Sequence, residues 1–318
     1  MVQFRVKTLL AAFGFFSMGQ AVSAAPTVNV SVEPVALLVR EICADQCEVF
    51  SLVPKGASEH SWQPGPKDVI RAKQAVASIA IGLGFDEVWF KNIGVIPKSV
   101  LKLGEQLSPM TWWSDDMSGE HKQSGHSKAH QKKDNHKSKK HEHDDDHDHD
   151  HAGKDDPHVW TDAGRMAKAA ELISTHLAIH LPSAAAGFKD RSKLIAERLT
   201  KLQLDTDTRR KNWKTRPVVM FHDTAGYFAR RFNLPVLSVS AGASGHNHSA
   251  KMIANVARRF KEVSVAAIMV EKDDGAAKNL ARELKTIVKV VDFAASRPYK
   301  RWDDWYLHLV TAWEDVLK

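Results

Sequence analysis

Apolar residues along the chain follow two spacings, which predict strands and helices in alternation. Short apolar runs bounded by turn residues are typical of buried strands, whereas apolar residues three or four positions apart are typical of helices. The predicted strands cover residues 27–32, 48–54, 78–83, 99–103, 217–221, 235–240, 265–271 and 287–292. Strands that alternate with helical segments over this length indicate parallel sheets covered by helices on both faces.

One predicted helix is much longer than the others. Residues 183–213 contain no proline, and their apolar side chains recur at helical spacing along one face. This helix separates two sets of strands. We therefore predict an α/β protein with two parallel-sheet lobes, residues 26–182 and 214–318, joined by one long rigid helix.

The first residues have the pattern of an export signal. Arg5 and Lys7 precede an apolar run at 9–18, and small residues follow at 22–24. This order predicts a cleavable secretory signal peptide over residues 1–24. The apolar run is too short to cross a bilayer, and no later run reaches about 18 apolar residues. No cysteine follows the cleavage point, so we expect a protein without a lipid anchor, outside the cytoplasm.

Charge and cysteine content narrow the possible partners. The formal net charge is +7, but the lysines are scattered and the chain is exported, which argues against binding to nucleic acid. Cys43 and Cys47 lie where a predicted helix gives way to a strand. In an oxidising compartment we expect them to form a small disulfide loop. The alternative, a pair of thiol metal ligands, requires free thiolates, which such a compartment removes.

A polar tract interrupts the first lobe. Residues 114–156 contain nine histidines, twelve acidic residues and eight lysines, but no Leu, Ile, Val or Phe. Such a segment cannot bury enough apolar surface to fold, so we predict a disordered insertion. Imidazole and carboxylate groups are metal ligands, which favours a metal-collecting tract over a merely solubilising loop. Its histidines are His121, His126, His130, His136, His141, His143, His147, His149 and His151.

Fixed metal ligands should lie where strands end, because ligands in open α/β sheets bind beside the carboxyl ends of the strands. One candidate follows the second strand, one lies where the polar tract ends, one follows the fifth strand and one ends the last strand. These candidates are His60, His158, His222 and Asp292. Three imidazoles and a carboxylate are a suitable shell for zinc. Taken singly, each residue could instead be a cap or a hydrogen-bonding group, and spacing alone does not bring the four together.

Three motifs carry a family resemblance. GASEHSWQPGPKD at 56–68, DPHVW at 156–160 and FHDTAGYFARRFNL at 221–234 occur in that order. They resemble the signatures of the metal-specific periplasmic solute-binding proteins of ABC transporters. The acidic, His-rich insertion before DPHVW resembles the zinc-uptake branch of this family, the ZnuA-like proteins. The resemblance implies two α/β lobes, a rigid connecting helix and a metal ion bound in the cleft between the lobes.

The resemblance also implies a ligand set and a cargo. His60, His158 and His222 match the family's motif positions, and Asp292 matches its last carboxylate, with Glu59 as the alternative fourth ligand. Members that take manganese carry Glu where His222 stands, and imidazole suits zinc, so the expected cargo is Zn(II). We expect a monomer that captures zinc in the periplasm and delivers it to the permease of an ABC transporter. The His-rich tract would be an auxiliary zinc collector, and no small organic ligand is expected.

Some residues depart from the family pattern or stand outside it. VDFAASRPY at 291–299 replaces the family's LDPLG-like ending after the last Asp, which puts the geometry around Asp292 in question. His246 and His248 could form a second weak site or a polar loop. Trp62 and Trp160 flank two of the ligands and are expected to wall the cleft.

Two other function classes compete with transport. A zinc-buffering or adhesive surface protein would have the same ligands but no transporter. A zinc hydrolase is less favoured because the chain has no HExxH motif, and four protein ligands leave no position for an activated water.

Overall fold

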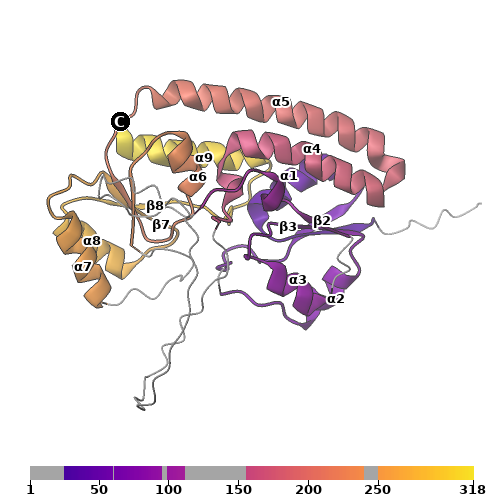
Figure 1. The fold of residues 1–318 in the computed structure, drawn as a ribbon, viewed down its shortest axis with the longest axis horizontal. Helices are drawn as coiled ribbons and strands as arrows, with labels where there is room; N and C mark the ends of the chain where they lie inside the picture. The colour runs from indigo at the N-terminus through magenta and orange to yellow at the C-terminus, as the bar shows by residue number, and fades with distance from the viewer. Residues whose placement is uncertain (1–24, 60, 95–98, 112–154, 240–249) are drawn as a thin grey trace, which may run out of the picture.

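A computed structural model describes residues 25–59, 61–94, 99–111, 155–239 and 250–318 of the chain. These residues form two four-stranded parallel sheets with helices packed around them (Figure 1). The strand orders are β2-β1-β3-β4 and β6-β5-β7-β8, so the second lobe repeats the topology of the first. The predicted fold class, two parallel-sheet α/β lobes joined by a long helix, is confirmed.

The first lobe is built from the predicted strands, which are shorter than expected. The strands are β1 (Thr27–Val30), β2 (Glu48–Ser51), β3 (Ala77–Ala80) and β4 (Val100–Lys102). The helices between them are α1 (Glu33–Cys43), α2 (Pro66–Lys73) and α3 (Glu87–Ile93), and a 3-10 turn, η2 (Gly104–Gln106), follows β4. Every residue of β3 is buried, as expected for a central strand covered on both faces.

The second lobe has the same plan. Its strands are β5 (Val218–Met220), β6 (Val236–Ser238), β7 (Ala267–Val270) and β8 (Val288–Val290). Its helices are α6 (Gly226–Arg231), α7 (Ala250–Phe260), α8 (Gly275–Glu283) and α9 (Trp302–Leu317). The central strands β5 and β7 are fully buried, whereas the edge strand β8 is partly exposed.

A helical hairpin connects the lobes. A 3-10 turn, η3 (Val159–Thr161), leads into α4 (Ala163–His180), and a second turn, η4 (Pro182–Ala184), leads into the 26-residue helix α5 (Ala185–Arg210). Figure 1 shows α5 running along one side of both lobes. None of the helices in the described part of the chain is both long enough and apolar enough to span a membrane.

Helix α9 ties the second lobe to the first. It packs against α1 and α5, and its buried aromatic residues belong to a hydrophobic core that also contains β1 and α1. Polar contacts fix both of its ends: the Trp302 amide donates to Glu41 of α1 at 3.2 Å, and Arg209 of α5 forms an ion pair with Glu314.

The predicted disulfide is present at the end of α1. Cys43 and Cys47 are joined, with their Cα atoms 5.4 Å apart. The bond closes a short loop between α1 and β2 and lies in the core of the first lobe.

Candidate metal centre

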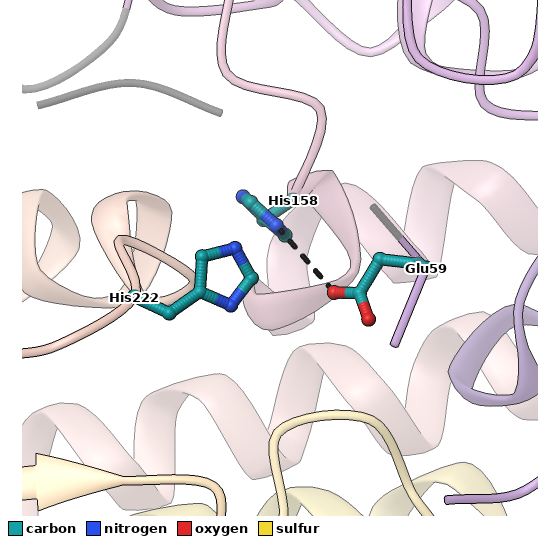
Figure 2. Close-up of side chains that lie close together, drawn as sticks. All are labelled: Glu59, His158 and His222. Atoms are coloured by element: carbon teal, nitrogen blue, oxygen red, sulfur yellow. Dashed lines mark ion pairs between the residues drawn. The ribbon is translucent and has the colours of Figure 1, made fainter. Parts of the chain in front are cut away.

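Three buried side chains from both lobes converge at the interlobe boundary. Each of Glu59, His158 and His222 offers one ligand atom, and these atoms lie within 4.8 Å of one another (Figure 2). Glu59 comes from the loop after β2, and His158 directly precedes η3. His222 follows β5 in the second lobe. The side chains thus meet where a cation could be bound between the lobes.

A carboxylate orients the imidazole of His158. Asp156 Oδ1 accepts hydrogen bonds from the His158 backbone amide at 2.9 Å and from ring atom Nδ1 at 2.7 Å. Because an ionised carboxylate only accepts, Nδ1 carries a hydrogen and Nε2 is the nitrogen suited to a metal ion. Nε2 lies 4.0 Å from Glu59 Oε1, so this nitrogen already faces the carboxylate of the cluster.

The second imidazole is oriented in the same way. His222 Nδ1 lies 3.1 Å from Oε1 of Glu271, which follows β7, the neighbour of β5 in the sheet. Burial opposes a charge on His222, but the hydrogen bond and charge of Glu271, with the charges of Glu59 and Asp223, raise its pKa to about 9. The carboxylates around this ring therefore stabilise a positive charge there, and a metal ion bound to the ring would take the place of its proton.

Negative charge dominates around the cluster. Burial raises the pKa of Glu59, the charge of Glu271 raises it further, and the two imidazoles oppose this rise. Glu59, Asp156 and Asp223 are each less than 5% exposed. Buried carboxylates are costly unless a cation compensates them, so this arrangement favours a bound cation.

An open cleft gives access to the centre. Its volume is about 490 Å³, and residues of both lobes line it, including Trp62, His222 and Glu271. Trp160 lies in the core, with its ring centroid 5.0 Å from that of His158. Trp62 thus forms part of the cleft wall, whereas Trp160 packs against the His158 ring within the core.

The comparisons with known proteins agree with this architecture. The family model described as zinc-uptake complex component A, periplasmic, matches residues 28–318. The chain belongs to this family. Its members are binding components of a transport complex, so the chain is not an enzyme and the hydrolase alternative is excluded.

Relatives of the zinc-uptake family cover most of the chain. The zinc-binding protein AdcA of Streptococcus pyogenes is 26% identical over 252 residues, which is 79% of this chain and 47% of AdcA. The chain thus spans about half the length of the curated relatives it matches. The crystal structure of ZnuA is 19% identical, with a TM-score of 0.70 over 92% of this chain and 98% of that one. A Cd-bound periplasmic metal-binding protein from Candidatus Liberibacter asiaticus is 17% identical, with a TM-score of 0.70 over 92% and 100%. The two structures show that the fold is shared.

One predicted ligand, Asp292, lies outside the cluster of Glu59, His158 and His222. Asp292 Oδ1 accepts the Ser296 amide at 2.7 Å, and Oδ2 accepts the Arg297 amide at 3.0 Å. Arg297 also forms an ion pair with this carboxylate at 3.5 Å. The turn after β8 thus engages both oxygens of Asp292, whereas Glu59, the alternative fourth ligand, lies in the cluster.

The remaining metal-site predictions fall on other parts of the chain. His60, His246, His248 and the nine histidines of the polar tract lie outside the described residues. Sequence reasoning did not identify Asp156 and Glu271, which orient the two imidazoles. A signal for Asp156 was its place two residues before His158, and a signal for Glu271 was its place at the end of the strand beside β5.

Proposed function

We propose that the protein binds Zn(II) in the interlobe cleft through His60, His158, His222 and one carboxylate, and carries it to a transporter. The observation that supports this most strongly is the buried cluster of two imidazoles and a carboxylate, with ligand atoms within 4.8 Å of one another. Zinc is commonly held by four nitrogen, oxygen or sulfur ligands in a tetrahedral shell. Manganese favours shells richer in oxygen, so the histidines favour zinc.

Glu59 is the carboxylate that best completes this set. It already lies in the cluster, whereas Asp292 would have to leave two backbone amides and Arg297 to reach a metal ion. Four protein ligands leave no coordination position for a reactive water, which suits a carrier. The Glu59→Gln variant should weaken zinc binding, and Asp292→Asn should leave the affinity within about threefold of the original.

Transport explains the other features of the chain. Family membership and the predicted export signal support a periplasmic protein that delivers zinc to an ABC transporter permease. Thr111 and Asp155 form an antiparallel bridge, so the chain leaves and re-enters the described structure at one place, three residues before His158. The His-rich tract is tethered there, and its many ligands would supply zinc at an effective concentration of roughly millimolar.

The test is the zinc content of the mature, full-length protein after washing with a chelator of moderate strength. The unmodified protein should retain one zinc ion per chain, and His222→Ala should lose it. His308→Ala, which changes a histidine on α9 outside the cluster, is the matched control and should retain the ion. Retention of zinc by His222→Ala would contradict the interlobe site.

A variant without residues 118–154, which keeps the bridge between Thr111 and Asp155, separates the two kinds of site. It should keep the ion that survives the chelator wash but lose weaker, additional zinc. If it keeps none, the tract is the main binding element and the interlobe proposal is wrong.

A further inference from the structure

A short antiparallel contact leads directly to His158. The Asp156 amide donates to the Met110 carbonyl at 2.8 Å, beside the bridge between Thr111 and Asp155. Because Asp156 also binds the ring and the amide of His158, the position of that ring depends on where this contact is held.

Tyr227 of the second lobe holds this contact from across the interlobe boundary. Its hydroxyl donates to the Asp156 carbonyl at 2.7 Å and accepts the Met110 amide at 3.0 Å. The residue is 0% exposed. Burial raises the pKa of its hydroxyl, which favours the protonated form that donates this hydrogen bond.

The ring of Tyr227 is itself fixed by the first lobe. The guanidinium of Arg165, on α4, lies 4.6 Å from the ring centroid. Arg165 Nε donates to the Leu107 carbonyl at 3.0 Å, and another of its nitrogens donates to the Ser108 carbonyl at 3.1 Å. Such a cation–π contact over a buried ring restricts its motion.

Gly226, the residue before Tyr227, also restricts the position of Asp156. A Cβ atom on Gly226 would lie 2.3 Å from Asp156 Oδ2, so the start of α6 packs closely against this carboxylate. The second lobe thus contacts Asp156 through its backbone carbonyl and its side chain. His222 lies on the same segment, four residues before Gly226, and its ring centroid is 5.3 Å from that of His158.

We propose that Tyr227 is a positioning residue for metal binding, which holds His158 in place relative to His222 across the interlobe boundary. The inference rests on the proposed function only in taking these two imidazoles as ligands. The two imidazoles are then in position before the metal ion binds, so binding of the ion does not have to order them. Supporting groups around metal ligands typically change affinity by about 10- to 100-fold, so removing the Tyr227 hydroxyl should weaken zinc binding by roughly tenfold.

The test compares Tyr227→Phe with Tyr306→Phe in the mature, full-length protein. Tyr306 is a matched control, since it is equally buried and its hydroxyl has no hydrogen-bond partner within the described part of the chain. Competition with a chelating dye measures the affinity of the tightest zinc site. Nitrogen-15 NMR of the metal-free protein reports the tautomer of His158, which a loss of stability alone would not alter.

We expect Tyr227→Phe to bind zinc about tenfold more weakly and to show a mixture of His158 tautomers, and Tyr306→Phe to match the original protein. Unchanged affinity in Tyr227→Phe would overturn the proposal. So would a lower melting temperature with unchanged affinity and tautomer, because Tyr227 would then be merely structural. Asp156→Asn is a second variant that keeps the backbone contacts of Tyr227 and should also give mixed tautomers; a single unchanged tautomer would count against the proposal. Failure of the proposed function is seen separately, as zinc retention by His222→Ala.

Discussion

The packing of Gly226 against Asp156 allows a sharp test of how the ligands are oriented. In Gly226→Ala the added Cβ would lie 2.3 Å from Asp156 Oδ2, well inside the contact distance of the two atoms. Relief to an ordinary separation of about 3.4 Å requires a shift of roughly 1 Å. Both atoms are buried, so the shift must move either the carboxylate or the start of α6.

The expected cost follows from the hydrogen bond that such a shift breaks. Asp156 Oδ1 lies 2.7 Å from His158 Nδ1, and a movement of about 1 Å takes this pair beyond hydrogen-bonding distance. A hydrogen bond to a charged group contributes about 1.5–3 kcal/mol. If that free energy is lost from the bound state, zinc affinity falls by roughly 10- to 150-fold.

The assay is a competition titration with a zinc-chelating dye, made at neutral pH on the full-length variant. Gly275→Ala is the matched control, because Gly275 is also the first residue of a helix and a Cβ there would contact nothing within 4 Å. We expect this control to bind zinc like the unmodified protein. If Gly226→Ala also does so while remaining folded, orientation by Asp156 does not contribute to affinity and the reasoning is refuted.

Three further predictions concern stability and spectroscopy. Hydrogen bonds from Arg209 and Trp213 lower the pKa of Glu314 to about 2. The stabilisation of the folded state by ionised Glu314 is therefore present above about pH 4.5 and is lost as the pH falls toward 2. Arg209→Gln should lower the free energy of unfolding in urea by about 1 kcal/mol at pH 7 and change it little at pH 2. Replacing both disulfide cysteines with serine should cost about 2 kcal/mol in the same assay, given the short loop, and leave zinc affinity unchanged. Zinc should change tryptophan emission, and Trp160→Phe should abolish most of that change, because this indole is 5.0 Å from the His158 ring.

The sequence predicted the order of elements well because each strand is a short apolar run between turn residues. All eight predicted strands are present, although β2 ends at Ser51 rather than at residue 54, since apolar residues continue into the loop. Helix α3 was not predicted, because its seven residues EVWFKNI are rich in side chains that also favour strands.

The centre could be predicted only in part. The motifs identified His158 and His222, which lie together in the structure. They favoured Asp292 as the fourth ligand, with Glu59 as the alternative, and the choice between the two depends on how the turn after β8 folds. In this chain the backbone amides of Ser296 and Arg297 bind the Asp292 carboxylate, a contact that no spacing rule contains.

The packing of α9 on α1 has a consequence for export. The Trp302 amide reaches Glu41, 261 positions earlier in the chain, and the aromatic residues of α9 complete the core around α1. Contacts between such distant positions form slowly, and the first lobe has an unfilled apolar face until α9 has been made. For a chain with the predicted export signal, we therefore expect a precursor that stays loosely packed until the whole of α9 is available.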